Sequence, residues 1–236
     1  QKIPVNKAAS HFKDFKQKEK DKTPHFLWNA KMRFGKTFTA YQLALEMGWA
    51  KILVLTFKPA VQSAWEEDLN THVDFKGWQF ISNNSLQFDD ADESKPFVCF
   101  GSFQDYLGKN KSTGGIKHKN EWVHLTDWDC VIFDEYHYGA WREKSKDLFA
   151  GEDSEVDMDM GDVKEFDEDI LPITTKHYLY LSGTPFRAIE SGEFIEEQIF
   201  NWTYSDEQRA KEEWQGNDNP YASLPGMVMM TYKMPD

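Results

Sequence analysis

Short apolar runs alternate along the chain with longer stretches in which apolar residues recur every three or four positions. The short runs have the length of buried strands, and the longer stretches have the length of amphipathic helices. This alternation is typical of an α/β domain with a mostly parallel sheet and helices on both faces, because parallel strands need crossover helices. We predict strands at residues 25–30, 52–57, 97–100, 130–133 and 177–181.

Helix signals lie between these strands. A helix is predicted for residues 37–47, where Gly48 ends the amphipathic pattern, and another from Pro59 to about residue 69. A short helix follows near residues 103–107. After Phe186 the chain is polar and helical in pattern to about residue 215, and residues 227–232 form an apolar, strand-like run.

We divide the chain into three parts. Residues 1–24 form a lysine-rich helical lead-in, residues 25–190 the α/β domain, and residues 191–236 a helical segment and strand that lead toward a second domain. Residues 151–169 contain ten acidic residues and one lysine, a composition typical of a disordered insertion. The sequence begins with Gln1 instead of methionine, so we expect it to be part of a longer chain.

The net charge of −13 is unevenly distributed. The acidic insertion carries −9 of it, which leaves −4 for the rest of the chain. Residues 2–22 hold seven lysines against three acids, and residues 109–119 hold four lysines and no acid. A nucleic-acid partner is therefore not excluded, although we expect this chain alone to bind nucleic acid weakly.

The cysteine count and the hydropathy of the chain argue against a disulfide-stabilised, zinc-binding or membrane-spanning protein. Cys99 and Cys130 lie in apolar runs, and we interpret them as reduced core thiols, since two cysteines form neither a disulfide framework nor a four-ligand zinc site. No apolar run approaches the roughly 20 residues that cross a bilayer. We expect a cytoplasmic protein without a membrane partner.

The strongest chemical signal is the segment from Ala30 to Thr37, which reads AKMRFGKT. It lies between a predicted strand and a predicted helix, the setting of a phosphate-binding loop. Backbone N–H groups from Ala30, Arg33, Phe34 and Gly35 onward would surround the phosphates. Lys36 would reach the β- and γ-phosphates of ATP, and the Thr37 hydroxyl would bind Mg²⁺.

A pair of carboxylates follows the fourth predicted strand. Asp134 and Glu135 stand at its carboxyl end, the edge at which open α/β sheets bind ligands. We assign Asp134 to magnesium and Glu135 to the activation of the attacking water, so that Lys36, Asp134 and Glu135 are the catalytic candidates.

Small hydroxyl residues follow the fifth predicted strand, in the run from Ser182 to Pro185. The hydroxyls of Ser182 and Thr184 can hydrogen-bond the carboxylate pair and transmit the state of the nucleotide. We assign them, with His137, to coupling.

These three segments, in this order and spacing, resemble motifs I, II and III of superfamily 2 helicases. The likeness extends over residues 26–185 and is greatest to the helicase-type subunit of type I and type III restriction enzymes. It implies a RecA-like P-loop NTPase domain that uses ATP and Mg²⁺ to move along or open DNA, in a restriction or phage-defence protein. By the same resemblance, Lys58, Ser102 and Gln104 lie on loops that face the nucleic-acid backbone.

The chain also departs from the family pattern. Arg33 stands where the family has glycine, and Tyr136 stands where alanine is typical. Nothing after Pro185 resembles the second motor domain, whose arginines complete the ATP site. We therefore expect a second RecA-like domain in the parent chain and very slow hydrolysis by this part alone.

Two other function classes stay open at this point. One is a P-loop ATPase that switches a protein partner without touching nucleic acid. The other is a degenerate nucleic-acid-binding module that no longer turns over ATP.

Overall fold

The computed structural model describes residues 2–31, 33–57, 59–106, 120–136, 173–183, 192 and 194–223. The chain divides into two compact units, residues 1–201 and residues 202–236. The first unit contains a seven-stranded sheet in the order β3-β4-β2-β6-β8-β1-β9. These strands are β1 (His25–Ala30), β2 (Lys51–Thr56), β3 (Gln79–Ile81), β4 (Phe97–Ser102), β6 (Cys130–Asp134), β8 (Tyr178–Ser182) and β9 (Ile199–Trp202).

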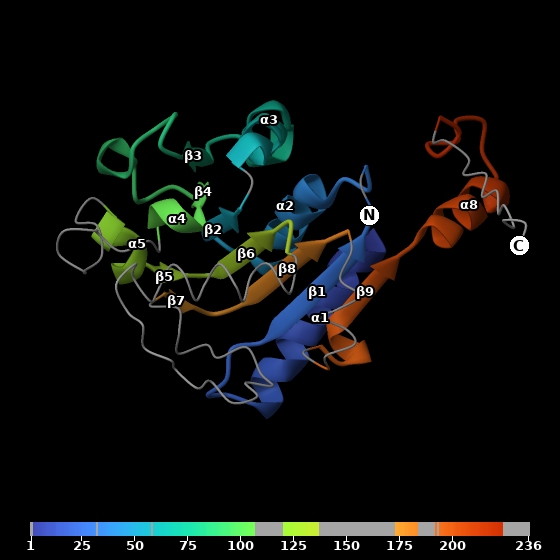
Figure 1. Ribbon diagram of the computed structural model, residues 1–236, viewed down its shortest axis with the longest axis horizontal. Coiled ribbons are helices and arrows are strands. Elements are labelled where there is room, and N and C mark those ends of the chain that lie inside the picture. Colours follow the sequence, from blue (N-terminus) through green and yellow to red (C-terminus); the bar gives the residue numbers. More distant parts are fainter. Residues whose placement is uncertain are drawn as a thin grey trace, which may run out of the picture. The chain divides into compact units, whose positions relative to one another are not determined.

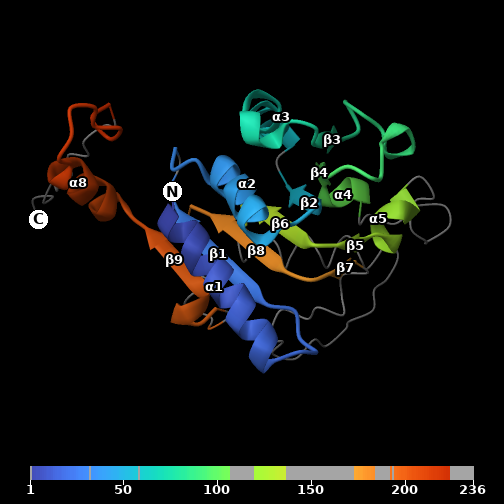
Figure 2. The same cartoon turned by 180° about the vertical axis from the view of Figure 1, so that it is seen from behind.

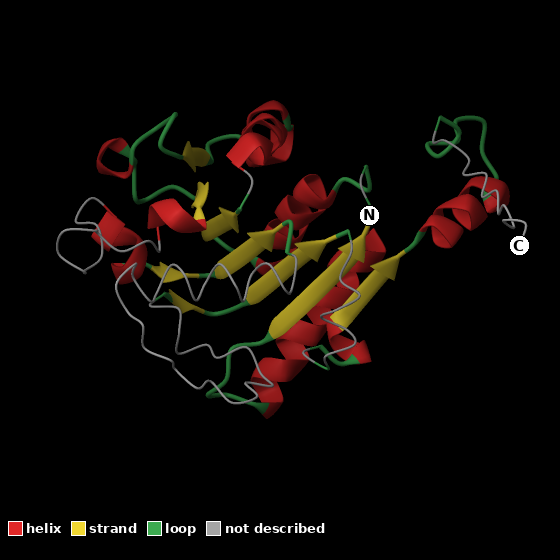
Figure 3. Cartoon of the chain, in the orientation of Figure 1, coloured by secondary structure: helices red, strands yellow, loops and turns green. Residues whose placement is uncertain are grey.

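The central strands are parallel, as the hydrophobic pattern predicts. The pairs β1–β8, β6–β8, β2–β6, β2–β4 and β3–β4 all run in the same direction. A second sheet of two short parallel strands joins β5 (Asp127–Trp128) to β7 (Thr174–Thr175). Figure 3 shows the main sheet as one layer of strands with helices packed against it.

Helices cover both faces of the main sheet (Figures 1 and 2). On one face lie α1 (Lys2–Lys18), α2 (Lys36–Met47) and α3 (Gln62–Thr71), and the ring of Phe12 on α1 packs against Phe26 of β1. The other face carries α4 (Phe103–Tyr106) and α5 (Glu121–Leu125). Phe103 and Val123 join a buried apolar cluster with Phe133 and other side chains of alternate strand positions. This arrangement confirms the predicted α/β class.

Short 3₁₀ turns complete the connections of the first unit. They are η1 (Pro59–Val61), η2 (Val73–Phe75), η3 (Phe88–Asp90) and η6 (Glu196–Gln198).

One edge of the sheet differs from the sequence-based expectation. Residues 199–202 form strand β9, whereas the pattern predicted polar helix from residue 186 to residue 215. Only Ile199 and Phe200 of this strand are buried, so the apolar signal is too short to separate a strand from a helix turn. The short strand β3 was missed for the same reason.

The second unit contains helix α8 (Tyr204–Glu213). Thr203 and Asp206 form a capping box, in which the Asp206 carboxylate accepts the Thr203 N–H at 2.8 Å. The lysine-rich residues 109–119, the acidic insertion predicted at 151–169 and the strand predicted at 227–232 lie outside the described residues.

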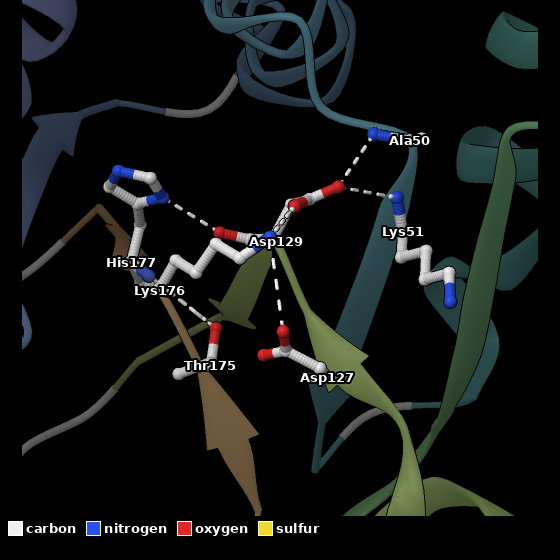
Figure 4. A network of polar contacts seen from close by, with 7 residues as sticks. All are labelled: Ala50, Lys51, Asp127, Asp129, Thr175, Lys176 and His177. Atoms are coloured by element: carbon white, nitrogen blue, oxygen red, sulfur yellow. Dashed lines mark hydrogen bonds and ion pairs between the residues drawn. The ribbon is translucent and has the colours of Figure 1, made fainter.

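A polar network ties the strands together near their amino ends (Figure 4). The Asp129 carboxylate accepts the backbone N–H groups of Ala50 and Lys51 at 2.8 and 3.0 Å, and the Lys176 ammonium at 2.8 Å. Burial raises the pKa of Asp129, but these three hydrogen bonds outweigh it and hold the pKa below its ordinary value. The ring of His177 is bonded to the Asp129 backbone carbonyl at 2.7 Å. The network therefore stabilises the register of β2, β6 and β8.

None of the helices in the described part of the chain has the length and apolar character to cross a lipid bilayer.

Candidate nucleotide-binding site

The carboxyl ends of four neighbouring strands meet at one edge of the sheet. Thr56 of β2 lies beside Asp134 of β6, and Asn29 of β1 lies beside Ser182 of β8. Because these strands are parallel and adjacent in the order β2-β6-β8-β1, the segments that follow them emerge at the same edge. The structure thus brings together the three segments that the sequence analysis singled out.

Among the described residues of the loop between β1 and α2, Gly35 and Arg33 adopt the left-handed region. Gly35 has φ 82°, and Arg33 has φ 69°. A side chain in this conformation costs on the order of 1–2 kcal/mol, a cost that glycine avoids. Arg33 thus has a backbone conformation that favours glycine, the residue typical of the family at this position. The side chain of Arg33 is exposed.

Lys36 begins helix α2 and turns back across this loop. Its ammonium donates a hydrogen bond to the carbonyl oxygen of Ala30 at 2.8 Å. Burial lowers the pKa of Lys36, and the charges of Glu135 and Asp134 oppose that shift. Thr37 follows in the first turn of the same helix and is half-buried. An ammonium and a helix N-terminus at the end of a turned loop form a setting for phosphate.

Asp134 ends β6 and is 7% exposed. Its Oδ1 accepts the backbone N–H of Glu135 at 2.9 Å, and its Oδ2 accepts the indole N–H of Trp65 at 2.8 Å. Burial raises the pKa of Asp134 and the Glu135 charge adds to this, while the hydrogen bonds and Lys36 act in the opposite direction. A buried carboxylate with a raised pKa beside a cation is typical of a functional site.

Glu135 shares the unusual backbone of Arg33. Its φ is 56°, and among the described residues these two are the non-glycine residues with positive φ. Left-handed residues persist where the surrounding structure holds them, and they concentrate at ligand and catalytic sites. Arg33 lies in the loop before Lys36, and Glu135 directly follows β6. The charges of Glu135 and Lys36 interact, so the two left-handed residues lie in segments that are electrostatically coupled.

The third segment lies against the first. Ser182 is fully buried at the end of β8. A Cβ at Gly183 would stand 3.7 Å from the carbonyl oxygen of Ala30, the oxygen that accepts the Lys36 ammonium. His137 and Thr184, the other coupling candidates, lie outside the described residues.

The three candidates for nucleic-acid contact are less completely described. Lys58 lies outside the described residues, as does the side chain of Gln104. The hydroxyl of Ser102 donates to the Asp105 carboxylate at 2.7 Å and accepts the Asp105 N–H at 3.1 Å. It therefore stabilises the start of α4.

Tryptophans of the first unit differ in their burial. Trp65 and Trp128 are fully buried, whereas Trp78 and Trp122 are half-buried. The indole of Trp65 also bonds Asp134, a contact that the sequence analysis missed. No local signal announces it, because 69 residues separate the two partners.

A groove of about 590 Å³ opens beside α2. Phe38 and Gln42 of α2, Asn6 of α1 and His72 before η2 contribute to its wall. Phe38 directly follows the Lys36–Thr37 pair along the chain, so one wall residue of the groove is the next residue in sequence after the phosphate-binding loop. The sequence analysis did not single out these residues.

The side chains at the strand edge suit a hard cation. Thr37 supplies a hydroxyl and Asp134 a carboxylate, the oxygen ligands that Mg²⁺ takes in nucleotide sites. The charges of Glu135 and Asp134 both act on Lys36 and raise its pKa against the effect of burial, so the ammonium lies within electrostatic range of both carboxylates. Among the described residues no cluster of three or more His, Cys, Asp or Glu forms an all-protein metal site. Mg²⁺ bound there would neutralise phosphate charge.

The mostly parallel sheet with helices on both faces has the fold of a RecA-like P-loop NTPase domain. The family model described as "Type III restriction enzyme, res subunit" matches residues 1–187. The chain belongs to this family of helicase-like restriction subunits.

A curated relative supports the same family. The "Putative type II restriction enzyme and methyltransferase RM.MpnORF110P C-terminus" of Mycoplasma pneumoniae is 36% identical over 208 residues, which cover 79% of this chain and 29% of that protein. This chain thus spans less than a third of the relative's length.

Two solved structures are also similar. One is the Sulfolobus solfataricus SWI2/SNF2 ATPase core in complex with dsDNA, at a TM-score of 0.47 and 13% identity, covering 80% of this chain and 33% of that one. The other is a nuclease-deletion mutant of the Type ISP restriction-modification enzyme LlaGI in complex with a DNA substrate mimic, at a TM-score of 0.47 and 10% identity, covering 87% and 20%.

Proposed function

We propose that this domain binds and hydrolyses Mg-ATP as the first half of a DNA translocase or helicase motor in a restriction or phage-defence protein. The observation that carries the proposal is the convergence of Lys36, Asp134 and Glu135 at the carboxyl edge of the sheet, where Lys36 is influenced by both carboxylates. Family membership adds the restriction setting.

Each residue has a distinct task in this proposal. The loop N–H groups and Lys36 bind the phosphates, and the Thr37 hydroxyl and Asp134 hold Mg²⁺. Glu135 orients the attacking water and accepts its proton. Its left-handed backbone sets the direction of the side chain at the end of β6. Ser182, Thr184 and His137 transmit the state of the site.

We assign the groove beside Phe38 to the base of the nucleotide. Asn6 and Gln42 carry amides, which offer both a donor and an acceptor for the edge of a purine. A ring such as Phe38 offers an apolar surface for stacking. Gln42→Ala is expected to weaken ATP binding and to reduce the preference for ATP over GTP, whereas an unchanged preference would remove Gln42 from base recognition.

The track is proposed to be duplex DNA, contacted by Lys58, Ser102 and Gln104 through phosphates and not through bases. The second RecA-like domain of the parent chain completes the ATP site, so this part alone turns over ATP very slowly. Both cysteines are buried free thiols, which suits a cytoplasmic protein.

The decisive experiment is steady-state ATP hydrolysis by the full-length protein without nucleic acid, with single strands and with duplex DNA. Stimulation by duplex DNA supports the translocase. Stimulation by single strands or RNA alone replaces it with an unwinding helicase. A rate that ignores every nucleic acid favours an ATPase that switches a protein partner.

A further inference from the structure

Trp65 connects three elements of the nucleotide site from within the core. It lies on α3, and its side chain is fully buried. Its indole N–H donates to Asp134 Oδ2 of β6 at 2.8 Å. Its backbone carbonyl accepts the hydroxyl of Tyr41, from α2, also at 2.8 Å. The Tyr41 and Trp65 rings meet edge to face, with centroids 5.3 Å apart.

These contacts restrict the Asp134 carboxylate. One oxygen is bonded to the indole and the other to the Glu135 N–H, so the plane of the carboxylate is held from two directions. Each oxygen keeps lone-pair capacity after accepting one hydrogen bond. A buried carboxylate without the indole bond would rotate more freely and would lose a partner for a buried oxygen.

Trp65 is in turn held by Tyr41 of α2. Tyr41 lies one helical turn beyond Thr37 on α2, so the helix that carries the proposed magnesium hydroxyl also bonds the backbone of Trp65. The Asp134 carboxylate and the helix that carries the Thr37 hydroxyl are therefore both bonded to the buried pair of Tyr41 and Trp65. Such outer contacts orient metal ligands, and their loss costs about 10- to 100-fold in metal affinity.

We propose that Trp65 is a positioning residue that orients Asp134 for Mg²⁺ in the nucleotide complex. The inference rests on the proposed ATP site and adds to it a residue outside the three motif segments. The indole N–H acts through Asp134 and does not touch the nucleotide.

The test compares two matched substitutions in the full-length protein. Trp65→Phe and Trp128→Phe each remove the same volume from a fully buried position and each delete one indole hydrogen bond, since Trp128 donates to the Val123 carbonyl at 2.8 Å. Trp128 lies on β5, before the start of β6, and serves as the control for packing. The probe is the non-hydrolysable analogue AMP-PNP, titrated by calorimetry with EDTA and with saturating Mg²⁺.

The gain in AMP-PNP affinity that Mg²⁺ produces is expected to fall about tenfold or more in Trp65→Phe. Trp128→Phe is expected to keep the wild-type gain, and the two variants should bind AMP-PNP equally in EDTA. An unchanged gain in Trp65→Phe would overturn the positioning role while the ATP site stands. A wild-type protein that binds no AMP-PNP would overturn the ATP site and the positioning role together.

A second variant covers the case in which Trp65→Phe fails to fold. Benzothienylalanine at position 65 replaces the indole N–H by sulfur and keeps the bicyclic shape. It is expected to reproduce the loss of the Mg²⁺-dependent gain. A wild-type gain in that protein would show that only the bulk of the Trp65 ring matters.

Discussion

The ammonium of Lys36 and the carbonyl oxygen of Ala30 are joined by a hydrogen bond of 2.8 Å that closes the phosphate-binding loop on itself. The bond holds the lysine at the mouth of the loop, between the end of β1 and the start of α2. Burial lowers the pKa of this lysine, so the protonated form gains from any anion that reaches it. A bound phosphate would therefore either replace the neutral Ala30 carbonyl as the acceptor of the Lys36 ammonium or accept a hydrogen bond in addition to it.

Lys36→Ala is expected to weaken ATP binding about 10- to 100-fold, because a charge-assisted hydrogen bond contributes roughly 1.5–3 kcal/mol. The fold should keep its stability, since the substitution removes a partly buried charge. Isothermal calorimetry of the full-length protein measures the affinity. Lys95→Ala, at an exposed lysine paired with Asp92, is the control. Wild-type affinity in Lys36→Ala would refute the assignment of the loop.

Glu135→Gln is expected to retain ATP and to slow turnover by at least about a hundredfold, because the amide no longer accepts a proton from water. Single-turnover hydrolysis in the full-length protein, together with nucleotide binding, separates the two effects. Glu67→Gln, at an exposed position of α3, controls for the loss of one negative charge. Turnover that survives in Glu135→Gln would move the catalytic role to another residue.

The left-handed backbone of Arg33 predicts opposite responses to two substitutions. Arg33→Gly removes the strain of a side chain at positive φ, whereas Arg33→Val places a β-branched side chain there. We expect Arg33→Val to be about 1–2 kcal/mol less stable than Arg33→Gly in urea unfolding. The same pair of substitutions at Lys20, in an exposed turn without positive φ, should not show this order. Equal stabilities at position 33 would contradict the loop conformation.

Asp129→Asn is expected to lower the free energy of unfolding at neutral pH by about 1–3 kcal/mol, because the ionised carboxylate accepts two backbone N–H groups and an ammonium. The folded-state pKa lies below the ordinary value of 3.8. The stabilisation is therefore fully present above that ordinary value and is lost as the pH falls through the folded-state pKa. Urea unfolding of both proteins at neutral and acidic pH measures it, and a difference that did not shrink in acid would contradict the role of the charge.

Gly101→Ala is expected to destabilise the fold by about 1–3 kcal/mol, the usual cost of overpacking. A Cβ at this position would overlap the ring of Tyr106, which is buried and hydrogen-bonded to Phe100 and Cys99. Thermal unfolding checks the prediction. Gly77→Ala is a contrasting case, since a Cβ there meets no neighbour and the cost comes from its positive φ alone.

Much of the fold was predictable because each central strand is a short run of apolar residues that are adjacent in the sequence. The predicted bounds of β1 match the structure, and those of β2, β4, β6 and β8 differ by one or two residues. Gly48 ends α2 as predicted, and the structure shows it in the left-handed conformation. In contrast, β9 and β3 sit at the two edges of the sheet and are short, and their apolar signal does not distinguish strand from other structure.

The sequence by itself determined the α/β class, the central parallel strands, and the positions of Lys36 near the start of α2 and of Asp134 and Glu135 at the end of β6, because these depend on residues close together along the chain. Only the tertiary structure decided the strand order, the left-handed backbone of Glu135 and the bond from Trp65 to Asp134. The reason is physical: a hydrogen bond across 69 residues depends on how α3 packs against the sheet, and neither partner carries a local pattern that names the other.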